Sequence, residues 1–428
     1  MEGDHWHARE RDGESNTVTD AFDKCRLPQE IEALIASGLY PYYLPVEERL
    51  QYGEVVMNGR RVLMAGSNDY LALSNDPRVK AAGADALRRL GAGNSGSRVL
   101  NGTLTLHHTL EGELAEFLGH EAAMVVSTGY QANLALAPLF GPRDLLLADR
   151  HIHASLIEAA RLGQAKLRRY RHNDTAHLGR LLESADQGGG RLILTEGMFS
   201  VTGDLCDLPG IADLADRHGA RVIIDSAHDV GLLGPRGSGA AEHHGRQSAV
   251  DVQTVTFSKC FGTLGGAVAG PRQVIDYLRH SSRAALFSAS LPAACAAAAL
   301  TSLRIIRTEP ERRRRVLASA GRLRDGLAAL GFDVPAHGTP TVPLQVGDGL
   351  LCCRFWTELF QEGILANAML PPSVPEGKAL IRLSVTAAHT DAHVDRLLEA
   401  VGTVAGRLGL PVRTPRGPVA RRTRRSDA

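Results

Sequence analysis

From residue 122 onward, short apolar segments of strand length alternate with longer segments whose apolar residues recur at helical spacing. Alternation of this kind predicts an α/β fold, with a mostly parallel central sheet covered by helices on both faces. The strands are expected at 122–127, 144–149, 166–171, 191–196, 221–226, 252–257 and 265–269. Helices are expected between most of them, at 130–139, 154–162, 176–184, 208–217 and 272–282.

Segments on either side of this alternation add further elements. Ahead of it, helices are expected at 28–36, 79–90 and 106–118. After it, a smaller α+β domain is expected from a helix at 293–308, strands at 331–335, 341–345, 350–353 and 379–385, and a closing helix at 391–408. The chain is thus expected to contain a disordered tail (1–20), an N-terminal segment (21–60), a large domain (61–292), the small domain (293–410) and a basic disordered tail (411–428).

Composition narrows the class of protein only slightly. The chain has 428 residues, of which 44% are hydrophobic, and its formal net charge is +1, so no overall field points to nucleic acid or a membrane. The six cysteines lack metal-ligand spacing, and no apolar run approaches transmembrane length. We therefore expect a cytoplasmic protein without a membrane span or a nucleic-acid partner, in which the basic run 312–315 forms a solvated helix face.

The most distinctive chemistry follows the strand at 252–257. Residues 256–266 read Thr-Phe-Ser-Lys-Cys-Phe-Gly-Thr-Leu-Gly-Gly, so that Lys259 stands between hydroxyl residues and a glycine-rich run. In a partly dry pocket an amine has a lowered pKa and becomes nucleophilic, and the hydroxyls and glycines suit a phosphate. These features suggest a Schiff base with pyridoxal phosphate (PLP), although a lysine on a strand-to-turn edge would give the same short motif.

Other candidate ligands also follow strands, where ligands bind in a parallel sheet. Gly129 and Tyr130 open a helix that suits a phosphate, and His153 could stack on a planar cofactor. Asp225 ends an apolar strand and could either cap the next turn or keep a pyridine nitrogen protonated, which PLP chemistry requires. No carboxylate or thiol joins His151 and His153 in a metal set, so no metal site is predicted.

The glycine-rich loop 91–103 admits two interpretations. Its backbone could approach a ligand, with Arg98 as an anion contact, or the loop could be a flexible surface segment.

Taken together and in order, these motifs resemble the α-oxoamine synthases, a family of PLP-dependent acyltransferases. The resemblance extends over about residues 28 to 408. It is carried by 68–71 (Asn-Asp-Tyr-Leu), 128–130 (Thr-Gly-Tyr), 149–155 (Asp-Arg-His-Ile-His-Ala-Ser), 196–200 (Glu-Gly-Met-Phe-Ser), 225–228 (Asp-Ser-Ala-His), 256–259 (Thr-Phe-Ser-Lys) and 382–390 (Arg-Leu-Ser-Val-Thr-Ala-Ala-His-Thr).

The resemblance implies a fold-type I PLP enzyme, a homodimer whose active site lies at the subunit interface and whose large domain binds the cofactor. Lys259 would carry PLP and later move the Cα proton of the substrate. Asp225 would hold the pyridine nitrogen, His228 the ring hydroxyl, and His153 would stack on the ring. The other cofactor contacts that it implies are Thr128, Gly129, Tyr130, Glu196, Ser200, Thr256, Ser288 and Ser290.

The implied reaction is a decarboxylative Claisen-type condensation of a small amino acid with an acyl thioester, which yields an α-amino ketone, CO2 and a free thiol. Arg382 would clamp the amino-acid carboxylate, with Arg98 as the next candidate, and Asn68 would help to order the contacts at the ring. Whether the thioester is carried by coenzyme A or by an acyl carrier protein stays open. Two other functions also stay open: an aminotransferase or aldolase on the same fold, and a non-catalytic partner subunit.

Two positions depart from the family pattern. Ser226 stands where a second acidic residue is common, and Ala289 stands where a threonine that reaches the partner's phosphate is common. The loop 95–103 looks most like that of serine palmitoyltransferase, which favours a small amino acid.

Overall fold

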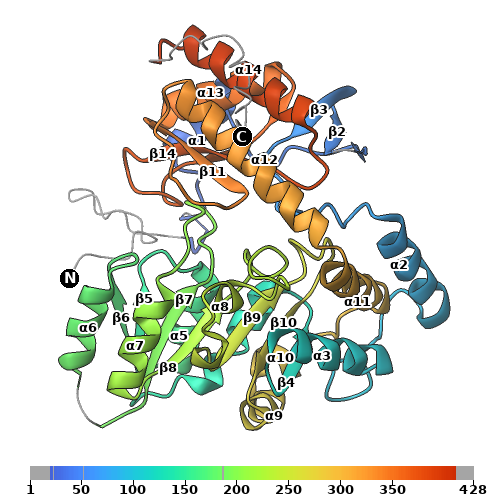
Figure 1. Ribbon diagram of the computed structural model, residues 1–428, viewed down its shortest axis with the longest axis vertical. Coiled ribbons are helices and arrows are strands. Elements are labelled where there is room, and N and C mark those ends of the chain that lie inside the picture. The colour runs from blue at the N-terminus through green and yellow to red at the C-terminus, as the bar shows by residue number, and fades with distance from the viewer. Residues whose placement is uncertain (1–19, 23, 52, 186–187, 411–428) are drawn as a thin grey trace, which may run out of the picture.

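A seven-stranded sheet forms the centre of the larger part of the molecule (Figure 1). The computed structural model describes residues 20–22, 24–51, 53–185 and 188–410. The strands lie in the order β4 (Ala122–Val126), β10 (Gly266–Gly270), β9 (Val252–Thr256), β8 (Arg221–Asp225), β7 (Arg191–Glu196), β5 (Leu145–Asp149) and β6 (Lys166–Tyr170). Within this sheet only β10 runs antiparallel to its neighbours. The expected α/β class and all seven expected strands are confirmed, to within a residue or two at each end.

Helices cover both faces of this sheet, because successive strand residues point into two different apolar cores. Val126, Ile223 and Val268 belong to the core that holds α4 (Gly129–Leu134), α5 (Ala154–Gly163) and α9 (Arg272–Ser281). Val125, Val222 and Ile224 belong to the core that holds α3 (Thr105–Leu118), α6 (Thr175–Glu183), α7 (Leu208–His218) and α11 (Ala293–Thr308). A sheet that is buried on both faces leaves only the strand ends open to ligands.

The C-terminal part packs above one edge of this layer (Figure 1). From α11, which lies against α2 (Pro77–Leu90), the chain enters α12 (Pro310–Ala329). A small antiparallel sheet follows, in the order β11 (Thr341–Gly347), β14 (Ala379–Ser384) and β13 (Asn367–Met369), together with α13 (Gly349–Gln361) and α14 (Asp391–Arg407). The expected strands at 341–345 and 379–385 and the closing helix are confirmed.

Two of the expected strands in this part are wrong. Residues 350–353 belong to α13, because Asp348 caps that helix by accepting from Leu351 N at 2.7 Å. The apolar run continues at helical spacing, so that Cys352, Phe355 and Leu359 are all buried. Residues 331–335 form no strand, since they begin at a left-handed Gly331 (φ +98°) and pair with no strand in the described structure.

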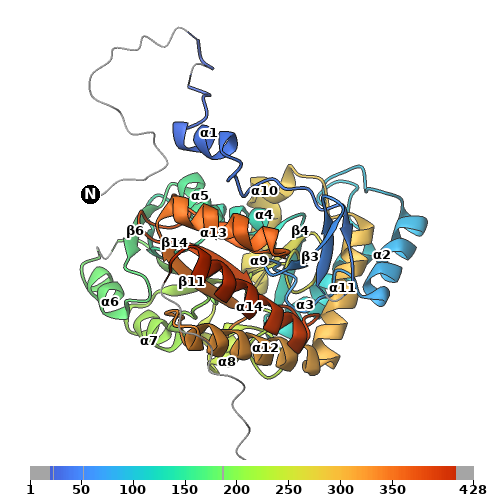
Figure 2. The same ribbon diagram turned by 90° about the horizontal axis from the view of Figure 1, so that it is seen from above.

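The N-terminal segment contributes strands to the C-terminal part. After α1 (Gln29–Ala36), which projects from the body in Figure 2, the strands β1 (Glu48–Arg49), β2 (Glu54–Met57) and β3 (Arg60–Met64) form an antiparallel ribbon. Its last strand pairs in parallel with β12 (Ile364–Leu365). This sheet was not predicted from the sequence, because β12 is only two residues long and its partner lies far away along the chain.

The basic run 312–315 on α12 was expected to form a solvated helix face, but only part of it does so. Arg313 is 5% exposed and donates to Ile306 O at 2.7 Å and to Pro235 O at 2.8 Å. Arg312 donates to Asp76 Oδ2 at 2.7 Å, whereas Arg314 is largely exposed. Two of these arginines therefore tie α12 to loops of the larger part of the molecule.

Some expectations concern parts of the chain that the structure describes only in part. Apart from Asp20, the tails at 1–20 and 411–428 lie outside the described residues. Among the helices that are described, none is long and apolar enough to cross a bilayer.

Candidate active site

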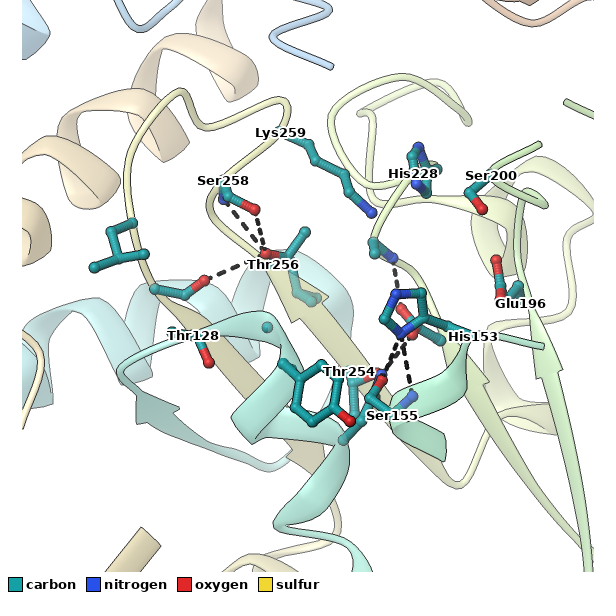
Figure 3. A pocket seen from close by; sticks show the side chains of 18 residues that line it. Thr128, His153, Ser155, Glu196, Ser200, His228, Thr254, Thr256, Ser258 and Lys259 are labelled. Carbon is teal, nitrogen blue, oxygen red and sulfur yellow. Dashed lines mark hydrogen bonds between the residues drawn. The ribbon is translucent and has the colours of Figure 1, made fainter. Parts of the chain in front are cut away.

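The carboxyl ends of the parallel strands surround a cavity of about 260 Å³ (Figure 3). Its lining comes from the last residues of β7, β8 and β9 and from the segments that follow β4, β5, β7, β8 and β9. The residues that line it are Thr128, Gly129, Tyr130, Asn133, His153, Ser155, Glu196, Ser200, Asp225, Ala227, His228, Thr254, Val255, Thr256, Ser258, Lys259, Leu264 and Gly265.

Lys259 lies on the turn between β9 and β10, and its side chain extends into the cavity (Figure 3). The turn is closed by Phe257 N donating to Gly265 O and by Gly262 N donating to Lys259 O, both at 2.9 Å. Burial lowers the pKa of Lys259 to about 8, although Asp225 and Glu196 oppose this shift. The neutral, nucleophilic form of the amine is therefore far more accessible near neutral pH than for an exposed lysine.

Asp225 ends β8 as a buried carboxylate in a defined orientation. Its Oδ2 accepts from Asn133 Nδ2 at 2.7 Å, and its Oδ1 accepts from Ala227 N at 2.9 Å. Asn133 in turn donates to Ser155 Oγ at 2.8 Å, and Ser155 Oγ lies 2.7 Å from His153 Nδ1 (Figure 3). The carboxylate and the imidazole ring thus belong to one hydrogen-bonded network, and the ring remains open to the cavity.

His228, Tyr70 and Arg382 form a second network at the side of the cavity that faces the C-terminal part. His228 Nδ1 lies 2.8 Å from Tyr70 OH, and Arg382 Nη2 donates to Tyr70 OH at 3.0 Å and to Asn68 Oδ1 at 2.8 Å. Burial, reinforced by the charge of Lys259, holds the pKa of His228 well below its usual range, so the imidazole is neutral. Arg382 Nε is buried and has no hydrogen-bond partner among the described residues.

Glu196 is buried beside these groups, and its Oε1 also has no hydrogen-bond partner within the described structure. Burial, together with the nearby charge of Asp225, raises the pKa of Glu196 well above its usual range. The carboxyl group of Glu196 is therefore harder to ionise than an exposed one, and its Oε1 is available for a hydrogen bond with a ligand in the cavity.

Hydroxyl groups and a glycine line the opposite end of the cavity. Thr256 Oγ1 lies 2.9 Å from Ser258 Oγ, and Gly129 packs directly against Thr256. A Cβ at Gly129 would stand 2.5 Å from Thr256 Oγ1, so only glycine fits there. The hydroxyls of Thr256 and Ser258 and the backbone at Gly129 suit a phosphate group.

Three candidate site residues lie elsewhere. Ser288, Ser290 and Arg98 line a second cavity, of about 300 Å³. Arg98 is paired with Glu111 at 2.8 Å and bonds Thr103 Oγ1 at 3.1 Å. The glycine-rich loop is held in place, since Ser290 N donates to Gly96 O at 3.0 Å.

Several residues of the site were not identified from the sequence. Tyr70, Asn133 and Thr341 are buried polar side chains that bond to Asp225, His228 or Arg382 but belong to different elements. Asn133 carried one usable signal, because an amide one helical turn after Gly129 lies on the same helix face as the phosphate-binding turn.

The fold and this cavity define a fold-type I transferase. Residues 60–401 match the model of the family described as aminotransferase class I and II. An 8-amino-7-oxononanoate synthase of Symbiobacterium thermophilum is 41% identical over 388 residues, covering 90% of this chain and 98% of that protein. A serine palmitoyltransferase of Bacteriovorax stolpii is 38% identical over 387 residues, covering 90% of this chain and 92% of its own length.

Solved structures agree with these sequences. A serine palmitoyltransferase of S. paucimobilis, with a PLP–myriocin adduct bound, has a TM-score of 0.88 at 33% identity and covers 91% of this chain and 98% of that one. The chain spans only about half (53%) of the length of a Mycobacterium tuberculosis relative that is 41% identical over 418 residues. The chain belongs to the α-oxoamine synthases, within the aminotransferase class I and II family.

Proposed function

We propose that this chain uses PLP to condense an amino acid with an acyl thioester, releasing CO2 and a free thiol and forming an α-amino ketone. One observation carries the proposal: the Lys259 amine and the Asp225 carboxylate face the same cavity from the ends of neighbouring strands of one sheet. Its membership of the α-oxoamine synthase family supports the same reaction. When bound, PLP supplies the electron sink for a carbanion at the amino-acid Cα.

The residues of the cavity fit PLP. Lys259 would hold the cofactor covalently through Nζ, and Asp225, kept in orientation by Asn133, would hold the pyridine nitrogen in its protonated form. His153 would cover the face of the ring, and the neutral His228 would contact the ring hydroxyl. The remaining contacts to the cofactor would come from Thr128, Gly129, Tyr130, Glu196, Ser200 and Thr256.

Arg382 is the residue that suits the substrate carboxylate. It is a buried cation, and no acidic side chain in the described structure forms an ion pair with it. Leaving a buried guanidinium N–H unpaired is costly, so its Nε is suited to a carboxylate that arrives with the substrate. Asn68 and Tyr70 hold the guanidinium in place through hydrogen bonds. Lys259 Nζ would accept the proton from the amino-acid Cα.

Two features of the substrates are proposed only by class. The resemblance of loop 95–103 to serine palmitoyltransferase and the serine in the name of a relative favour a small amino acid. The acyl group arrives as a thioester of coenzyme A or of an acyl carrier protein.

We further propose that two copies of the chain form the working enzyme. Large apolar side chains are exposed around the two cavities, with Leu100 at 81% and Phe287 at 80%, and Tyr130 and Leu264 are about half exposed. Apolar exposure concentrated around a binding site is typical of a protein interface. Ser288 and Ser290 would then contact the partner's cofactor.

We also propose that the protein acts in a reducing compartment such as the cytoplasm, because all six cysteines are free thiols.

A mass-spectrometric screen tests the reaction. The purified protein, loaded with PLP, is incubated with single amino acids and either coenzyme A or carrier-protein thioesters, and α-amino ketones and CO2 are measured. The expected result is one small amino acid that gives both products, with none formed by Lys259→Ala. A keto acid formed without CO2 would identify an aminotransferase instead, and failure to bind PLP would identify a non-catalytic subunit.

A further inference from the structure

His172 lies between two carboxylates, one at the end of β5 and one in the turn after β7, behind the wall of the active-site cavity. Its Nδ1 donates to Asp149 Oδ1 at 3.0 Å, and its Nε2 donates to Asp204 Oδ2 at 2.8 Å. Burial disfavours the charged ring, but the bonds to Asp149 and Asp204 outweigh burial and raise the pKa of His172 to about 9. At neutral pH the ring is therefore an imidazolium that both carboxylates hold.

Each carboxylate belongs to a segment that reaches the cavity. Asp149 is the last residue of β5, and its Oδ1 also accepts from His151 N at 2.7 Å, just ahead of His153. Asp204 closes the turn that contains Ser200, since Phe199 N donates to Asp204 O at 2.9 Å. The imidazolium thus joins the segment that carries His153 to the turn that carries Ser200.

Ring contacts reinforce this connection. The His172 ring stacks on His151, with centroids 3.9 Å apart and an interplanar angle of 21°. The His172 and Phe199 rings are nearly perpendicular, with centroids 4.5 Å apart. A glutamine at this position would lose both ring contacts as well as the charge.

The same turn continues toward the substrate side. Thr339 Oγ1 donates to Gly203 O at 2.7 Å, and Gly203 also packs against Thr341. Thr341 Oγ1 accepts from Arg382 Nη2 at 3.3 Å. A continuous path of contacts therefore leads from His172 through the turn at 199–204 to the arginine proposed for the carboxylate.

We propose that His172 is a positioning residue of the active site. It fixes the distance between the two walls of the cavity, namely the segment that carries His153 and the turn that carries Ser200. Through Gly203 it also fixes the position of Arg382. It touches neither cofactor nor substrate. The inference rests on the proposed function, because it assigns to these walls the binding of PLP and an amino acid.

The test replaces His172 by glutamine, which is similar in length but uncharged and cannot bridge both carboxylates with donors. His177→Gln is the matched control, since His177 lies in the next helix, accepts from Arg171 N and contacts neither Asp149 nor Asp204. Four quantities are measured: the PLP dissociation constant of the apo protein, the visible circular dichroism of bound PLP, and KM and kcat for the amino acid. Asp204→Asn and the double variant complete a cycle.

For His172→Gln we expect weaker PLP binding, a changed visible dichroism and a fall of about 10- to 100-fold in kcat/KM, since small displacements of positioned groups have effects of this size. His177→Gln should resemble the wild type, and the double variant should be no worse than the poorer single variant. If His172→Gln lowers only the melting temperature and leaves PLP affinity, dichroism and KM unchanged, the inference is overturned.

Asp204→Asn decides the matter with the same readouts if His172→Gln does not fold. A wild-type protein that binds neither PLP nor an amino acid would contradict the proposed function itself. Normal binding by the wild type together with unaltered variants would contradict only the role of His172.

Discussion

Arg382 carries a buried charge with an unused donor, and this makes its role testable by a substitution that keeps the charge. Lysine has no planar fork, so Arg382→Lys should raise the KM for the amino acid at least about tenfold, because a bidentate charged contact is worth a few kcal/mol. PLP content and the KM for the thioester should change little. Spectral titration with the amino acid measures the effect, and wild-type affinity in both Arg382→Lys and Arg382→Ala would remove Arg382 from this role.

Lys259 predicts a pH dependence for cofactor attachment. Burial lowers the pKa of this amine from 10.5 to about 8. Only the neutral amine is nucleophilic, so the rate at which apo protein attaches PLP should rise as pH increases through about 8 and then level off. Borohydride trapping followed by peptide mass spectrometry gives the rate and the site. A rate that keeps rising toward pH 10, or trapping at another lysine, would contradict the assignment.

At the scale of single residues, the sequence predicted the cavity residues at strand ends better than the side chains that hydrogen-bond to them. Lys259, Asp225 and Glu196 could be identified because each follows a recognisable apolar strand, and parallel strands bring their ends together. Tyr70 and Asn133 were missed because their contacts depend on how distant elements pack. The separation of Arg98 from the cavity could not be seen either, since its partner Glu111 lies on a helix whose orientation only the fold defines.

The hairpin between β9 and β10 holds Lys259 through its backbone, and two glycines provide a matched test. Gly262 (φ +65°) has Ser74 N only 2.3 Å from where a Cβ would stand, whereas Gly245 (φ +64°) has nothing within 4 Å. Gly245→Ala should lower the free energy of unfolding by about 1 kcal/mol, because alanine disfavours the left-handed conformation. Gly262→Ala should lower the free energy of unfolding by about 3 kcal/mol or more, because the backbone at Leu73 and Ser74 must also move. It should also reduce the amount of PLP that is covalently attached. Chemical unfolding of both variants measures the difference; equal losses would show that the turn tolerates the displacement.

Helices and strands were predicted correctly where one hydrophobic periodicity extended over the whole element. They were misassigned or missed where the segment was only a few residues long. Most strands of the large sheet are short segments dominated by apolar residues, and all seven were identified from sequence alone. Residues 350–353 were misassigned because four apolar residues fit either a strand or the first turn of a helix. The pairing of β3 with β12 depends on contacts that no local pattern encodes.

At the scale of the whole molecule, the proposed dimer predicts the effect of charges on its surface. Phe287→Glu or Leu100→Glu should shift the protein toward monomer in light scattering and lower PLP affinity, because a charge would be buried between the copies. Leu162→Glu, at a 63% exposed position on α5, is the control and should leave both unchanged. If the first two variants keep the mass and affinity of the wild type, this surface is not the interface. A single sequence could not supply this interface, since exposed apolar residues become recognisable only on a folded surface.

The pairing of β3 with β12 also sets an order for assembly during synthesis. Asn367 Nδ2 donates to Gly66 O across 301 residues, beside the point where β12 completes the sheet begun by β1 to β3. At ribosomal rates of about 5–20 residues per second, the N-terminal ribbon waits roughly 15–60 s for its partner strand. Every strand of the large sheet leaves the ribosome within that interval, so the cofactor-binding layer can form first. The sheet begun at the N-terminus is then among the last to close, and a nascent chain released early would expose an unpaired strand edge to chaperones or proteases.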